Sequence, residues 1–101
     1  MIKHIVLFQF QDFAEGKTKA ENLQIVKEKL ENLIHLIPQL KKIEVGLNLA
    51  EAPQSNYDLA LTTEFENYQD LRIYTNHPEH QAVLAIIGKV KKDRVCVDYE
   101  V

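Results

Sequence analysis

Hydrophobic and polar residues alternate at the start of the chain, and this period of two predicts a β-strand over residues 2–11. One face of that strand carries Ile2, His4, Val6, Phe8 and Phe10. The opposite face is also partly apolar, because Ile5 and Leu7 interrupt its polar residues. A strand with one face in water would alternate more cleanly, so both faces of this strand are expected to be covered.

Three later segments repeat the alternation and predict three more strands, over residues 43–49, 57–65 and 94–101. The loop between the first two of these, residues 51–56, is polar and long enough for a hairpin connection. The last strand places Val95, Val97, Tyr99 and Val101 on one face, and Arg94, Cys96, Asp98 and Glu100 on the other.

Between the strands, apolar residues recur at spacings of three and four, which predicts helices. The first helix is expected over residues 18–36, with Thr18 as its N-cap and Pro38 just beyond its end. A second helical region follows Asn67 and is broken near residues 76–78, because Pro78 suits the first position of a new helix. Gly88 is expected to close that last helix.

The order of elements is therefore β, α, β, β, α, β, which predicts an α+β fold of the ferredoxin-like class. In this fold a four-stranded antiparallel sheet carries both helices on one face. Because the first strand has apolar residues on both faces, the other face of the sheet is also expected to be buried. We therefore expect a homodimer formed by sheet-to-sheet packing, a dimeric α+β barrel. Residues 1–101 are expected to form a single domain.

The charge, the lengths of the apolar runs and the cysteine count of the chain argue against several classes of function. Twelve Lys and Arg against fifteen Asp and Glu leave a net charge of −3, which argues against nucleic acid and against a polybasic membrane surface as partners. No apolar run approaches the ~20 residues of a membrane span, and no signal-peptide pattern is present. The single Cys96 cannot form an internal disulfide. A cytoplasmic location is therefore expected.

The segment from Tyr74 to His80 is the richest in chemistry, because two of the four histidines fall within it. His80 lies in the first turn of the last helix, where the helix dipole disfavours a charged imidazole, so it is a candidate general base. Asp98 is a candidate to accept its other ring N–H and fix its tautomer. Alternatively, His77 and His80 only cap and pad the start of the helix.

The other candidate site residues also have structural interpretations. His4 lies on the buried face of the first strand, as a paired core histidine or as part of a pocket. Tyr74 can fill the core with its ring and place its hydroxyl at a cavity wall. Cys96 is expected to be a small buried residue. No third ligand joins His77 and His80, and no phosphate-binding loop is present, so no metal and no cofactor are expected.

Several segments together resemble the stress-responsive A/B barrel (Dabb) family over nearly the whole chain. They are Lys3 to Phe8, Glu44-Val45-Gly46, Tyr57 to Leu61, Phe65-Glu66, His77-Pro78-Glu79-His80-Gln81, Asp93-Arg94 and Val97-Asp98-Tyr99. Members of that family are dimeric α+β barrels, so the resemblance implies the same dimer.

Within that family, the chain is similar to the plant olivetolic acid cyclases, cofactor-free enzymes that close a linear polyketide by an aldol reaction. The resemblance implies catalytic roles for Tyr74, His80 and Asp98, and matches His4 and His77 to other histidines of those enzymes. Leu59 stands where the cyclases have a further pocket histidine, so the resemblance does not imply the same substrate or the same binding geometry.

Three functions follow as hypotheses. The first is a dimeric Dabb protein that binds a small apolar or aromatic molecule between sheet and helices. The second is a cofactor-free enzyme, a cyclase or isomerase, that uses His80 as its base and Tyr74 to orient a carbonyl. The third is a stress-linked structural or interaction protein without a ligand. A cavity lined by His4, Tyr74 and His80 would favour the first two.

Overall fold

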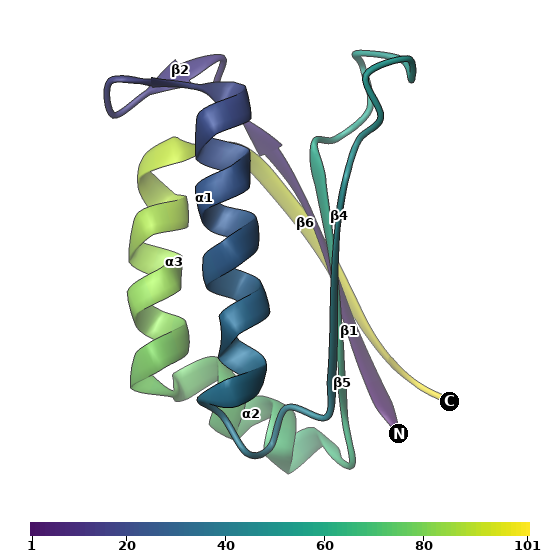
Figure 1. Ribbon diagram of the computed structural model, residues 1–101. Helices are drawn as coiled ribbons and strands as arrows, with labels where there is room; N and C mark the ends of the chain where they lie inside the picture. Colours follow the sequence, from purple (N-terminus) through teal and green to yellow (C-terminus); the bar gives the residue numbers. More distant parts are fainter.

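The computed structural model describes residues 1–101, and its main elements follow the predicted order (Figure 1). The strands of the main sheet are β1 (Ile2–Phe10), β4 (Lys42–Leu47), β5 (Leu59–Phe65) and β6 (Lys91–Glu100). The helices are α1 (Lys19–Asn32), the short 3₁₀ helix η1 (Leu33–His35), α2 (Tyr68–Asn76) and α3 (Pro78–Val90). A small hairpin of β2 (Phe13–Ala14) and β3 (Lys17–Thr18) precedes α1.

The sheet has the strand order β4-β5-β1-β6, and every neighbouring pair is antiparallel. Helices α1 and α3 lie side by side on one face of the sheet, and α2 lies near one end of that layer (Figure 1). The predicted ferredoxin-like α+β fold is thereby confirmed. None of the helices has the length and apolarity needed to cross a bilayer.

The core lies between the helices and the face of β1 that was expected to be buried. Val6, Phe8 and Phe10 are almost completely buried, and they belong to one cluster with Leu30 of α1 and Tyr74 of α2. Burying such side chains contributes about 1.5–3 kcal/mol each, which makes this cluster the main source of stability.

The predicted helix boundaries are correct at most ends. Thr18 caps α1 in a reciprocal arrangement with Glu21, and Pro78 begins α3 directly after the break at His77. Helix α1 itself ends at Asn32, and η1 continues the chain to His35. The hairpin at residues 13–18 was not predicted, although its turn contains Gly16 at a φ of 73°, a conformation that favours glycine.

Gly88 does not close α3, contrary to the prediction, because the helix continues to Val90. Its φ is not positive, so the chain does not need a glycine there for backbone reasons. A Cβ atom built on Gly88 would meet no heavy atom within 4 Å. The absent side chain therefore leaves open space beside the helix.

Strand β6 differs from the other strands because all ten of its residues are exposed. Its alternation places Arg94, Cys96 and Asp98 on the side of the sheet that faces the helices, opposite Phe8, Val6 and His4 of β1. The buried residues of the other strands show that the helix layer covers β4, β5 and β1. The helix-facing side of β6 is left uncovered.

The opposite face of the sheet carries an apolar surface with no cover in the single chain. We call it the outer-face patch, and it consists of Ile5, Leu7, Ala60, Val95, Val97 and Tyr99. In Val97, 53% of the residue surface is exposed, and Leu7, Val95 and Tyr99 are also exposed. The expectation of a second apolar face therefore agrees with the register of the strands.

Candidate functional site

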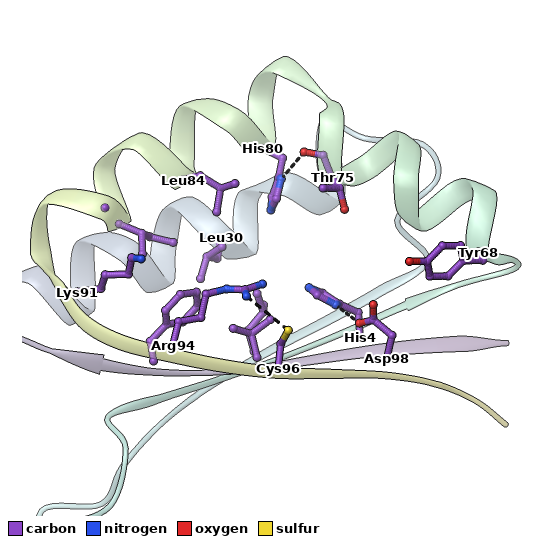
Figure 2. A pocket seen from close by; sticks show the side chains of 15 residues that line it. His4, Leu30, Tyr68, Thr75, His80, Leu84, Lys91, Arg94, Cys96 and Asp98 are labelled. Atoms are coloured by element: carbon purple, nitrogen blue, oxygen red, sulfur yellow. Dashed lines mark hydrogen bonds and ion pairs between the residues drawn. The ribbon is translucent and has the colours of Figure 1, made fainter.

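A cavity of about 480 Å³ lies between the uncovered face of β6, the neighbouring part of β1 and helix α3 (Figure 2). Its apolar walls come from Val6, Phe8, Leu30, Leu61, Leu84 and Ile87, and its polar lining from His4, Tyr68, Thr75, His80, Lys91, Arg94, Cys96 and Asp98. Gly88 also lines it, so the space left by that glycine is part of the cavity. Two of the three residues expected to line such a cavity, His4 and His80, do so.

His80 reaches the cavity from the first turn of α3, and only 7% of the surface of this residue is exposed. Its Nδ1 lies 3.0 Å from the backbone oxygen of Thr75. A carbonyl oxygen only accepts hydrogen bonds, so Nδ1 carries the proton in this contact. In the neutral ring Nε2 is then the atom with the lone pair, which makes it the basic nitrogen.

Burial is the main cause that lowers the pKa of His80 below its ordinary value. The hydrogen bond to Thr75 opposes this change, whereas charge at His4, Arg94 and His77 lowers the pKa further. The neutral ring is therefore favoured near neutral pH, as a proton acceptor requires.

Tyr74 lies behind His80 and does not line the cavity. Its ring centroid is 4.2 Å from that of His80 and 5.0 Å from that of Phe65, so it packs between them. The hydroxyl group is fully buried without a hydrogen-bond partner, and burial raises its pKa. The contact of Tyr74 with the site is through its ring, which supports the imidazole of His80.

Asp98 pairs with His4 and not with His80. The two residues are direct partners across β1 and β6, and Asp98 Oδ1 contacts His4 Nδ1. The carboxylate accepts the Nδ1 proton, so the Nε2 atom of His4 is free. Figure 2 shows the rings of His4 and His80 on opposite walls of the cavity. The backbone oxygen of Thr75 therefore fixes the tautomer of His80, a role that the sequence analysis assigned to Asp98.

His77 and Leu59 do not line this cavity. His77 is the N-cap of α3, and its Nδ1 accepts the backbone N–H of Glu79 at 3.1 Å, which is the capping role considered from the sequence. Leu59 is buried in β5 opposite Phe8, and it contributes to a second hollow near the loop between β4 and β5.

Several polar residues of the cavity were not singled out as site residues from the sequence. Lys91 and Arg94 bring two positive charges to its lining, and Thr75 orients His80. Cys96, which was expected to be buried, is exposed and lies 3.4 Å from a guanidinium nitrogen of Arg94. The reason is that no helix packs directly onto β6. No group of three metal-ligating side chains is brought together in the structure.

Comparison with known proteins gives one family. The model of the Dabb family, described as the stress responsive A/B barrel domain, matches residues 2–101. A dimeric protein of unknown function from Bacteroides fragilis is 40% identical, with 99% of this chain and 95% of that chain covered and a TM-score of 0.82.

Two further structures are similar. A dimeric ferredoxin-like protein of unknown function from Thermobifida fusca is 34% identical over 99% of this chain and 90% of that chain, with a TM-score of 0.84. A hydroxynitrile lyase from Passiflora edulis shares the fold at 16% identity, over 97% of this chain and 90% of that chain, with a TM-score of 0.79.

The lowered pKa of His80 predicts how stability depends on pH. The unfolded chain binds a proton at this ring near its ordinary pKa of 6.5, whereas the folded chain binds it only at lower pH. The contribution of His80 to the free energy of unfolding is therefore fully present above about pH 6.5. It is lost as the pH falls from there through the lower pKa of the folded chain. NMR titration of the ring should give a midpoint below 6.5, and urea unfolding should show the loss. In the His80→Gln variant, this part of the pH dependence of stability should disappear. A titration midpoint of the His80 ring at or above pH 6.5 in the native protein would contradict the prediction.

Proposed function

The chain belongs to the family of stress-responsive A/B barrel domains, and we propose that it is a homodimeric protein that binds a small, largely apolar molecule. The observation that carries this proposal is the cavity between sheet and helices. Its volume of about 480 Å³ falls within the roughly 300–1,000 Å³ that small-molecule sites occupy.

The composition of the cavity supports the same proposal. Small-molecule sites are lined mainly by apolar side chains, with a few polar groups that fix the orientation of the ligand. Here Val6, Phe8 and Ile87 supply apolar walls, and His4 and His80 supply two imidazoles that face each other. Such a site suits a compact ligand with an apolar body and at least one hydrogen-bonding group.

The proposed dimer rests on the outer-face patch. A contiguous apolar surface in water marks an interaction site, and a two-fold interface would bury the same patch on both copies. The relatives from Bacteroides fragilis and Thermobifida fusca are described as dimeric, which supports the same state for this chain.

A second candidate function is catalysis without a cofactor. His80 favours it, because its Nδ1 proton is held by Thr75 and its pKa is lowered by burial, which leaves a neutral Nε2 as base. Such a base would remove an acidic proton from a carbon next to a carbonyl. The hydroxynitrile lyase that shares the fold is named as an enzyme, which supports the idea that this architecture suits catalysis.

Filling the cavity from Gly88 tests the binding proposal. The neutral fluorescent probe N-phenyl-1-naphthylamine should bind to the native protein and gain fluorescence. Gly88→Leu should weaken that binding at least about tenfold, because its side chain enters space that is open. Gly88→Ala is the matched control: like Gly88→Leu it should stabilise the helix by about 1 kcal/mol, but it adds only one methyl group. Absence of probe binding to the native protein would refute the proposal.

Charge on the outer-face patch tests the dimer. Val97→Glu should dissociate it, because each copy would bury an additional carboxylate in an apolar interface. Sedimentation at micromolar concentration should give twice 11.7 kDa for the native chain and 11.7 kDa for the variant. Ile73→Glu on α2 alters an exposed apolar residue away from the patch and should remain dimeric. A native chain that sediments at 11.7 kDa would exclude the proposed dimer.

Proton exchange tests the catalytic candidate. In D₂O the native protein should accelerate exchange of the benzylic protons of phenylacetone, measured by NMR, and His80→Gln should slow it by roughly 10²-fold or more. His35→Gln is the control, because His35 is exposed at the end of η1 and does not line the cavity. Acceleration that survives in His80→Gln would remove His80 as the base.

A further inference from the structure

Two cations line one end of the cavity, and neither makes an ion pair with a carboxylate. Asp93, whose pKa is lowered first by a hydrogen bond from Tyr57 and also by charge at Lys91, does not line the cavity. None of the ion pairs in the structure includes Lys91 or Arg94. Asp98 is the only carboxylate in the lining, and it is already paired with His4. Figure 2 shows Lys91 and Arg94 toward one end of the cavity and Asp98 with Tyr68 toward the other. The cavity therefore has a positive end and an end that carries a carboxylate.

An irregularity in β6 brings Lys91 to this place. Asp93 is the partner of Gln9, but Lys91 is the partner of Phe10, so Lys92 is an extra residue in the strand. Regular alternation from Arg94 would turn Lys92 toward the helices and Lys91 away from them. The bulge reverses this order, and Lys91 joins Arg94 in the lining of the cavity.

Such an arrangement favours an anion. A charge near apolar walls is less screened than one on an open surface, so an unpaired cation there attracts a negative group more strongly. Lysine supplies a point charge, and the planar guanidinium of arginine matches a carboxylate with two parallel hydrogen bonds. Asp98 at the other end would repel the same group, which gives the ligand one preferred direction.

We propose that the ligand of this cavity is a small carboxylic acid with an apolar, ring-sized body. Its carboxylate lies between Lys91 and Arg94, and its body lies beside Gly88 and Ile87 and extends toward His80. The inference rests on the proposed binding function and names the chemical class of the ligand. It also places the carbon atoms of the body, and not the carboxylate, beside the basic nitrogen of His80.

The test compares two probes of the same shape, 2-naphthoate and 2-naphthamide, by displacement of N-phenyl-1-naphthylamine. The native protein should bind 2-naphthoate at least about tenfold more tightly, since a charge-assisted hydrogen bond contributes more than a neutral one. In the double variant Lys91→Gln/Arg94→Gln the two probes should bind about equally. Lys92→Gln is the matched control, because it removes one positive charge next to the site without altering the lining, and it should keep the preference.

The possible results distinguish the proposed ligand class, a carboxylic acid, from the proposed function, which is binding of a small molecule in the cavity. Equal binding of both probes to the native protein would overturn the carboxylic acid while leaving the cavity as a binding site. A preference that persists in the double variant would also overturn it, because other groups would then hold the carboxylate. Binding of 2-naphthamide to the double variant serves as the check that its cavity is still formed. If N-phenyl-1-naphthylamine does not bind to the native protein, the proposed function itself fails.

Discussion

The structure depends on one mismatch: the sheet has four strands, and the helix layer buries the inner face of only three. The buried faces of β1, β4 and β5 form the core with α1, α2 and α3, and this burial is what stabilises the fold. Strand β6 pairs with β1 but no helix packs directly onto it, so all of its residues are exposed. The cavity is the space that remains between β6 and α3 because the helix does not pack onto this strand.

The same strand links the proposed site to the proposed dimer. Because side chains alternate along a strand, Arg94, Cys96 and Asp98 face the cavity while Val95 and Val97 face the outer patch. A second copy of the chain seated on the outer face would fix the position of β6. It would thereby fix the wall that carries Asp98, and through Asp98 the orientation of His4. Assembly and ligand binding would then act on one element from opposite sides.

The sequence predicted the fold well because the fold follows from periodicity. The change from a spacing of two to one of three and four, and the proline at residue 78, marked nearly every main element. The site was harder, since it depends on register and on what lies above each strand. Asp98 was placed on the correct face, but only the pairing of β1 with β6 makes it the partner of His4. The bulge that turns Lys91 inward, and the open space at Gly88, have no signal in a pattern of hydrophobic residues.

A crystal structure of the purified protein would show directly whether β6 is open to a ligand on one face and covered by a second copy on the other. We expect an open cavity between β6 and α3, with Gly88 at its wall and the outer-face patch buried against a two-fold related copy. A helix α3 packed down onto Cys96 and Asp98, with the space filled by side chains, would contradict this expectation.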